Sequence, residues 1–125
     1  MAGNSWQQPV AGEPSWGSPH THVETLVDSA DPASTGNVTV TCSNVPTGAT
    51  GIFGFCSVLS ATTAGRALFI KDSSGNIFAG SRNPTTAIRG YTSFQVPLNS
   101  SKQFLYSVDN ADVNDVDIFM GGYFL

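Results

Sequence analysis

Residues 103–125 read QFLYSVDNADVNDVDIFMGGYFL, and this stretch decides the fold. Two apolar runs, residues 104–108 and 116–120, flank a polar segment rich in Asp and Asn, and the chain then closes on Tyr123, Phe124 and Leu125. Apolar residues at a chain end have to be buried to be stable, because exposed termini normally fray. We therefore expect the last strand to lie in the centre of a β core.

The rest of the chain repeats short alternating segments that are divided by turn residues. Strand patterns occupy residues 22–28, 37–42, 52–61, 66–71, 76–80, 91–98 and 103–108. The segments 44–51 (NVPTGATG), 72–75 (DSSG) and 99–102 (NSSK) have the composition of turns. About eight short strands without helical periodicity predict an all-β protein, a single antiparallel β-sandwich or jelly roll.

The loop lengths and the apolar pattern also predict how some strands pair. Residues 66–71 and 76–80 should form a hairpin around 72–75, and residues 91–98 and 103–108 another around 99–102. Pro97 cannot donate a backbone hydrogen bond, so its strand is expected at a sheet edge. Residues 52–61 carry apolar side chains on both faces, which predicts a buried central strand.

The two cysteines are expected to be buried free thiols. If residues 37–42 and 52–61 formed a hairpin centred on Ala49, Cys42 would lie opposite Cys56, where a disulfide could form in an oxidising compartment. Directly opposed residues fit disulfide geometry poorly, so we favour free thiols over a Cys42–Cys56 bond. No His lies between residues 23 and 125, so neither thiol has the partner that a catalytic nucleophile needs.

Residues 1–22 are predicted to form an extended arm that precedes a sandwich domain at 23–125. Prolines and glycines alternate through this segment and prevent a regular helix. Trp6 and Trp16, with Pro9 and Pro14 beside them, are candidate anchors for a partner, because indole rings gain most from burial. The arm either becomes ordered on a neighbouring subunit or packs on its own domain.

The charge distribution argues against nucleic-acid and membrane partners. Only 11% of the residues are charged; residues 1–36 hold four acids and no base, and residues 37–125 hold five of each. The five basic residues are dispersed and form no patch for phosphates. No apolar run approaches the ~20 residues that span a bilayer, and no secretory signal is recognisable, so we expect synthesis in the cytosol.

Two groups of residues are candidate metal ligands, although no cofactor is expected. His20 and His22 alternate on an extended segment and should point to the same side. Asp109, Asp112 and Asp115 lie in an Asp- and Asn-rich loop whose oxygens could hold Ca²⁺, but their spacing is not that of an EF-hand. The alternative is that both groups are ordinary surface and turn residues.

Several segments resemble a small β-sandwich module of bacterial surface proteins. They are Val45-Pro46 before a buried strand, residues 64–69 (AGRALF), residues 94–98 (FQVPL) and, most specifically, the ending 116–124 (VDIFMGGYF). The whole chain, with its Pro-rich arm and few charges, is also similar in style to small virion proteins of tailed bacteriophages, the capsid decoration proteins and head fibres.

This resemblance implies a non-enzymatic structural protein of a virus particle. Such a protein would be made in the host cytoplasm and would attach through its arm to the lattice of the major capsid protein, with copies of itself as further partners. A catalytic role is not expected, because the sequence offers no positioned His or carboxylate pair for acid-base chemistry. One alternative is a carbohydrate-binding or adhesive module that uses Tyr91, Tyr106 or Tyr123, and another is a filament subunit that donates its arm as a strand.

Overall fold

The computed structural model describes residues 17–30 and 35–125, without the side chains of residues 29 and 30. These residues form eight β-strands and no helix, which confirms the predicted all-β sandwich. The strands are β1 (Pro19–Ala30), β2 (Val38–Thr41), β3 (Gly51–Leu59), β4 (Ala67–Lys71), β5 (Ile77–Arg82), β6 (Gly90–Pro97), β7 (Gln103–Val108) and β8 (Asp115–Phe124).

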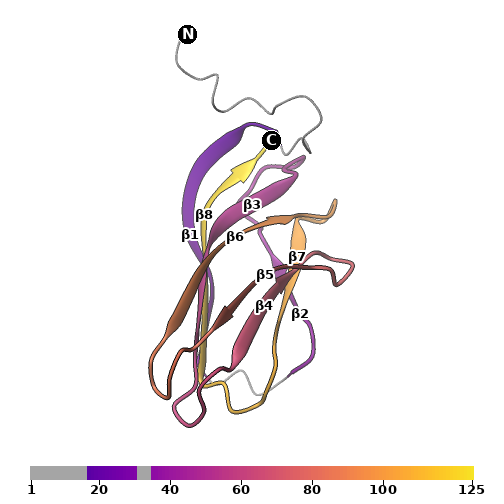
Figure 1. Ribbon diagram of the computed structural model, residues 1–125. Coiled ribbons are helices and arrows are strands. Elements are labelled where there is room, and N and C mark those ends of the chain that lie inside the picture. The colour runs from indigo at the N-terminus through magenta and orange to yellow at the C-terminus, as the bar shows by residue number, and fades with distance from the viewer. Residues whose placement is uncertain (1–16, 31–34) are drawn as a thin grey trace.

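The strands form two antiparallel sheets of four strands each, in the orders β1-β8-β3-β6 and β2-β7-β4-β5 (Figure 1). The pairings are nested: β1 pairs with β8, β2 with β7, β3 with β6 and β4 with β5. A single long antiparallel ribbon, folded over so that its successive pairs alternate between two sheets, produces this order. The topology is that of an eight-stranded jelly roll.

The core lies between the two sheets and is built from the inward side chains of both. β8 is hydrogen-bonded to β1 on one side and to β3 on the other, so the last strand is central, as predicted. Its Val116, Ile118 and Met120 are buried, and the side chains between them point outward. The largest fully buried side chain is Phe104 of β7, which contacts Phe94 of β6 across the core at a ring distance of 6.3 Å.

One of the two predicted hairpins is confirmed and the other is wrong, and the hairpin considered for the two cysteines does not form. β4 and β5 pair around residues 72–76, as expected. By contrast, β2 and β3 belong to different sheets, as do β6 and β7, although a tight polar turn does separate β6 from β7. Alternation shows which residues of a strand face the core, but both sheets use the same alternation, so it does not show whether a turn stays in one sheet or crosses to the other.

Both edge strands of the first sheet, β1 and β6, contain a proline. β6 lies at the edge of its sheet, as Pro97 predicted. β1 forms the opposite edge and begins at Pro19, so residues 19–22 of the predicted arm belong to the sheet. Residues 1–16, with Trp6, Pro9, Pro14 and Trp16, lie outside the described residues.

A β-bulge next to glycines sets the contact between β3 and β8. The register shifts between Phe53 and Gly54, where Phe53 is opposite Gly122 and Gly54 is opposite Met120, so Gly121 is the extra residue. A Cβ on Gly54 would lie 1.9 Å from the carbonyl oxygen of Phe119, and a Cβ on Gly122 would lie 2.4 Å from the Phe53 ring. Glycine is therefore required where these two strands approach most closely.

We expect the Gly54→Ala substitution to destabilise the fold by about 3 kcal/mol, because the added methyl group collides with backbone rather than with a flexible side chain. Denaturant unfolding monitored by circular dichroism measures the change. Gly80→Ala in β5 is the matched control, since its nearest contact would be an ordinary 3.4 Å to the Phe69 ring. The control should change stability by less than about 1 kcal/mol. Equal losses for both variants would contradict the assignment of the close approach.

Candidate functional site

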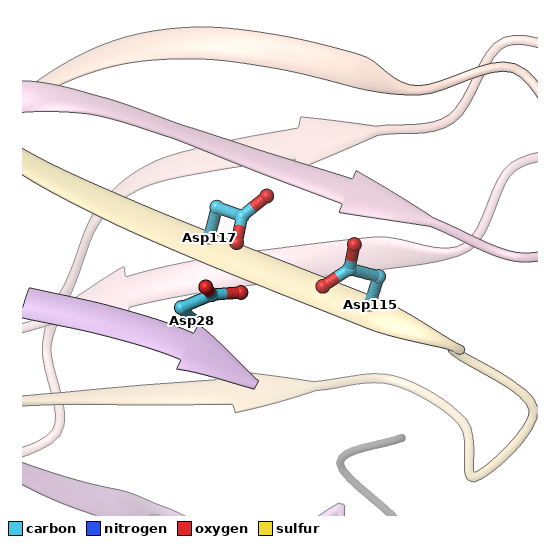
Figure 2. Close-up of side chains that lie close together, drawn as sticks. All are labelled: Asp28, Asp115 and Asp117. Atoms are coloured by element: carbon cyan, nitrogen blue, oxygen red, sulfur yellow. The ribbon is translucent and has the colours of Figure 1, made fainter. Parts of the chain in front are cut away.

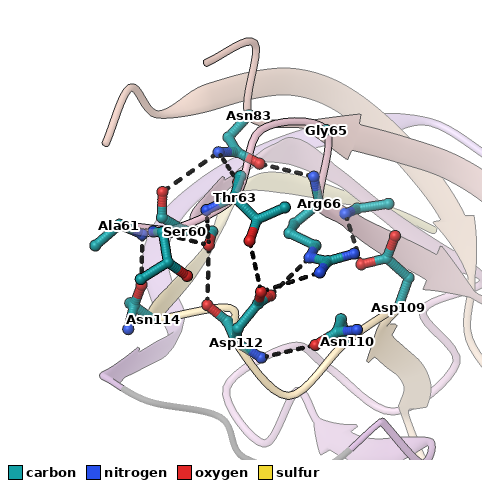
Figure 3. Close-up of polar contacts among 12 residues, drawn as sticks. Ser60, Ala61, Thr63, Gly65, Arg66, Asn83, Asp109, Asn110, Asp112 and Asn114 are labelled. Carbon is teal, nitrogen blue, oxygen red and sulfur yellow. Dashed lines mark hydrogen bonds and ion pairs between the residues drawn. The ribbon is translucent and has the colours of Figure 1, made fainter. Parts of the chain in front are cut away.

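One end of the sandwich carries a polar network that joins three loops (Figure 3). Asp112, in the loop between β7 and β8, accepts hydrogen bonds from Arg66 Nε at 2.7 Å, Arg66 Nη2 at 3.0 Å and Thr63 Oγ1 at 2.8 Å. The hydrogen bond from Arg66 is the main reason why the pKa of Asp112 is lowered. A carboxylate held by a two-pronged guanidinium contact is a structural tie, and its charge is already balanced.

Asn83 is the buried centre of this network. Its Nδ2 donates to the carbonyl oxygens of Ser60, Thr63 and Thr85, at 3.4, 2.9 and 3.0 Å, and its Oδ1 accepts from the backbone N–H of Arg66 at 2.8 Å. The side chain has no solvent exposure. A single amide thus satisfies backbone groups of the β3–β4 and β5–β6 connections, which meet at this end (Figure 3).

Replacing Asn83 with Ala should cost about 3 kcal/mol or more, because several buried backbone groups lose their partner at once. Thermal unfolding of the purified variant tests this expectation. Asn44→Ala provides the comparison, since exposed Asn44 makes one long bond of 3.2 Å to Glu24 and its loss should be nearly neutral. A neutral Asn83→Ala would mean that the network does not hold the two connections together.

The structure gives the three loop aspartates separate partners. Asp109 Oδ1 accepts from the backbone N–H of Ala67 at 2.9 Å, Asp112 is held by Arg66, and Asp115 pairs with Arg89. In the described part of the chain, the three that could share a metal ion are instead Asp28, Asp115 and Asp117, whose oxygens lie within 4.8 Å of one another (Figure 2). The i, i+2 spacing of Asp115 and Asp117 was visible in the sequence, but the approach of Asp28 depends on the register of β1 and β8.

Arg89 forms ion pairs with two of the three aspartates of this cluster, Asp115 and Asp117. Its Nη2 donates to Asp115 Oδ2, and its Nη1 donates to Asp117 Oδ2 at 3.0 Å and to Ser57 Oγ at 2.9 Å. Three carboxylates against one guanidinium leave an excess of negative charge. Burial, and next the charge of Asp115, raise the pKa of Asp117 above its ordinary value of 3.8. The cluster has the donors of a cation site, but Arg89 already supplies a cation.

We expect Asp28→Asn to increase stability at pH 7 by up to about 1 kcal/mol, because Asp28 lies directly opposite Asp117 in the β1–β8 ladder. A carboxyl whose pKa is raised by folding favours the folded state at low pH. That contribution is lost as pH rises from the ordinary value of 3.8 through the raised pKa of Asp117. The gain from Asp28→Asn should therefore shrink below pH 4 in a series of urea titrations.

Asp72→Asn is the control of opposite sign. Hydrogen bonds from Asn76 lower the pKa of Asp72, so this substitution should destabilise the protein at neutral pH. If Asp28→Asn also destabilised at pH 7, the three carboxylates would be cooperating rather than repelling one another.

His20 and His22 lie on β1 and share a side, as the sequence indicated. Both rings contact Tyr123, His20 in a stacked arrangement at 5.3 Å and His22 edge-on at 6.2 Å. His22 Nε2 also lies 3.3 Å from Glu24 Oε1. Within residues 17–30 and 35–125, neither histidine belongs to a group of three metal-ligand side chains. Their observed role is to cover the ring of Tyr123.

Cys42 and Cys56 are both free and both buried in the core. Burial raises the pKa of each thiol to about 12. A thiol that stays protonated at physiological pH is not a nucleophile, so the chemistry of both residues is that of small core side chains. The hairpin that would have placed them opposite each other does not form, because β2 and β3 lie in different sheets.

The outer side of the first sheet carries four phenylalanines, which we call the phenylalanine face: Phe53 and Phe55 of β3, and Phe119 and Phe124 of β8. Phe55 stacks on Phe119 at 4.8 Å, and Phe53 contacts Phe124 at 5.3 Å. Phe55 is 47% exposed, and the other three are half-buried. The prediction that both faces of this strand are buried is thus wrong for the outer face, since only Ile52, Cys56 and Val58 point into the core.

An open cleft of about 590 Å³ adjoins this face. Its walls come from β3, β6 and the edge strand β5 of the other sheet, and the lining residues are Phe53, Gly54, Phe78, Ser93, Phe94 and Gln95. Phe78 is 43% exposed. Aromatic walls with two neutral polar side chains suit an uncharged, flat ligand group with a hydrogen-bonding edge. The sequence carried no signal for this cleft, because its walls come from three strands of two different sheets, and the packing of those sheets is not visible in the sequence.

The five basic residues of the protein all bond within the chain. Arg66 and Arg89 hold aspartates, and Arg82 donates to the carbonyl oxygen of Gly65 at 2.7 Å. Lys71 donates to Asn37 at 2.8 Å, and Lys102 to the carbonyl oxygen of Val45 at 3.0 Å. Among residues 17–30 and 35–125 there is also no helix of the length and apolarity needed to cross a membrane.

Comparisons with known proteins identify no family. No family model matches the chain, and no curated protein matches it. Among solved structures, an arabinose-bound α-L-arabinofuranosidase is 8% identical with a TM-score of 0.32, over 84% of this chain and 22% of that one. A chain from the structure of infectious bursal disease virus, Gx strain, is 11% identical with a TM-score of 0.29, over 92% of this chain and 41% of that one. The chain spans less than half of either structure, and scores this low carry no functional argument.

Proposed function

We propose that the protein is a non-enzymatic structural component of a virus particle, a bacteriophage capsid decoration or attachment protein anchored through its N-terminal arm. The phenylalanine face carries this proposal. A cluster of half-exposed rings on one outer sheet of a charge-poor sandwich is an interaction surface, since apolar patches on soluble domains mark sites of association. Its partners would be the lattice of the major capsid protein and copies of the chain itself.

The state of the reactive side chains supports a binding role over a catalytic one. Both thiols are buried with raised pKa values, and the arginines hold aspartates or backbone carbonyls. Acid-base catalysis needs a titratable group that faces a cleft, whereas the cleft beside the phenylalanine face is lined by aromatic and neutral side chains.

The jelly roll is compatible with this role, because the architecture is common in viral capsid and lectin domains, although fold alone does not assign function. A short arm with two indoles would provide a small contact per copy. If copies of the chain associate, several arms bind the repeating particle surface at once. Each bound arm raises the effective concentration of the others at their sites, so the assembly is held more firmly than a single arm would be.

A carbohydrate-binding module is the second candidate, favoured by one observation. Tyr91 on edge strand β6 is 66% exposed and presents a ring on which a sugar could stack. The other two tyrosines considered for this role are less suited: Tyr106 is buried and Tyr123 is covered by His20. Loss of glycan binding in Tyr91→Ala, with the arm intact, would favour this candidate.

Removal of residues 1–16 tests the leading proposal and spares β1, which begins at Pro19. We expect the shortened chain to fold but to lose retention on purified particles by more than about tenfold in co-sedimentation, since two indole anchors are removed. The full-length Tyr91→Ala variant should be retained normally.

Three results would count against the proposal. Undiminished retention of the shortened chain would exclude the arm as the anchor. Absence of the chain from purified particles by mass spectrometry would overturn the virion assignment. Large regular assemblies of the pure protein in light scattering would instead support the filament alternative, in which the arm completes a neighbour's sheet.

A further inference from the structure

The described chain begins beside the phenylalanine face. Ser18 and Leu125 exchange two backbone hydrogen bonds, at 2.8 and 3.0 Å, and Leu125 directly follows Phe124 of that face. Gly17 has a φ of +82°, and a Cβ there would lie 1.3 Å from the carbonyl oxygen of Leu125. The chain therefore enters β1 through a backbone conformation and a close approach that only glycine permits, next to the end of β8. Residue 16 is attached at this point.

Residues 1–16 have the composition of a segment that covers an apolar surface. They hold Trp6, Trp16 and Val10, no basic residue and one acid, Glu13. They contain both tryptophans of the protein. The outer side of β8 changes along its length from Asp115 and Asp117 to Phe119, and an uncharged aromatic segment is suited to the phenylalanine end rather than the acidic end.

The length of this segment matches the distance to be covered. Trp16 is adjacent to Gly17, so its ring can reach the region of Phe124. Trp6 is eleven residues before Gly17, which allows an extended reach of roughly 36 Å, about the length of a ten-residue strand. An attached segment also has a high effective concentration at its own sheet, which favours this contact over one with a second molecule.

The cleft beside Phe53 offers what an indole ring requires. An indole buries a large apolar body and needs an acceptor for its Nε1–H. Phe53 and Phe78 supply aromatic walls, and Ser93 and Gln95, which also line the cleft, are residues with side-chain oxygen acceptors. The volume of about 590 Å³ has room for such a ring.

We propose that, in the free protein, residues 1–16 lie across the phenylalanine face of their own chain and place an indole in the cleft between Phe53 and Phe78. This inference goes beyond the proposed role on a particle and stands apart from it, because it concerns the isolated molecule. The occupant is the chain's own N-terminal segment, and the receptor surface consists of β3, β8 and the rim of β5 and β6.

Tryptophan fluorescence reads this contact directly, since both indoles belong to the segment. The probe is acrylamide quenching of the full-length chain, with a synthetic peptide of residues 1–16 as the reference for exposed indoles. We expect strong shielding in the full-length chain. Phe55→Ser and Phe78→Ser change exposed side chains, and each should weaken docking by roughly tenfold through loss of one apolar contact.

Ile88→Ser is the matched control, because Ile88 is 53% exposed and lies next to Arg89, near the opposite end of β6 from Pro97. It should leave the quenching unchanged, and circular dichroism should show that all variants are folded. The proposal is overturned if the full-length indoles quench like the peptide, or if Phe55→Ser and Phe78→Ser do not increase quenching.

Dilution separates the chain's own segment from that of a neighbour. Shielding that persists in a monomer, as measured by light scattering, supports the proposal. Shielding that disappears on dilution together with a fall in mass would overturn it and assign the face to the arm of a second copy. None of these measurements uses a particle, so their outcome is independent of the co-sedimentation test.

Discussion

The hydrogen bonding of β8 on both of its edges is the constraint on which the rest of the structure depends. β1 and β3 lie on either side of β8, and both are aligned by this same ten-residue strand. In the first sheet, the pair β3–β6 lies beside the pair β1–β8, and β8 joins the two pairs. In the second sheet, the pair β4–β5 lies beside the pair β2–β7 in the same way. Gly54, Gly121 and Gly122 permit this alignment, since a side chain at Gly54 or Gly122 would separate β8 from its neighbours.

The sequence predicted the elements well and their connections less well. Alternation located most of the strands, because burial of one face leaves a period of two in the residue types, and apolar runs located β3 and the central β8. Pro97 identified an edge strand through its missing N–H. The predicted β6–β7 hairpin was wrong, since a turn such as residues 99–102 has the same composition whether the chain stays in a sheet or crosses the core. Topology of this kind is decided by long-range pairing.

For the candidate sites too, the features set by local geometry were predicted and those set by long-range pairing were not. His20 and His22 were placed correctly on one side of a strand, because that follows from local geometry. The cluster of Asp28 with Asp115 and Asp117 could not be predicted, because it depends on a β1–β8 register that joins residues almost ninety positions apart. The outward position of Phe55 was also missed, since two apolar faces on one strand do not reveal which of them meets the other sheet.

The distribution of charge connects the fold to the proposed roles. With so few charged residues, the molecule uses its arginines to tie loops and strands together: Arg66 joins the β3–β4 and β7–β8 connections, and Arg89 joins the start of β6 to β8. What remains for contact with other molecules is apolar and neutral, the phenylalanine face and its cleft. If the arm rests on that face in the free protein, attachment to a particle requires the indoles to exchange one apolar surface for another. Such an exchange keeps both tryptophans out of water before and after attachment, and only the difference between the two contacts would drive assembly.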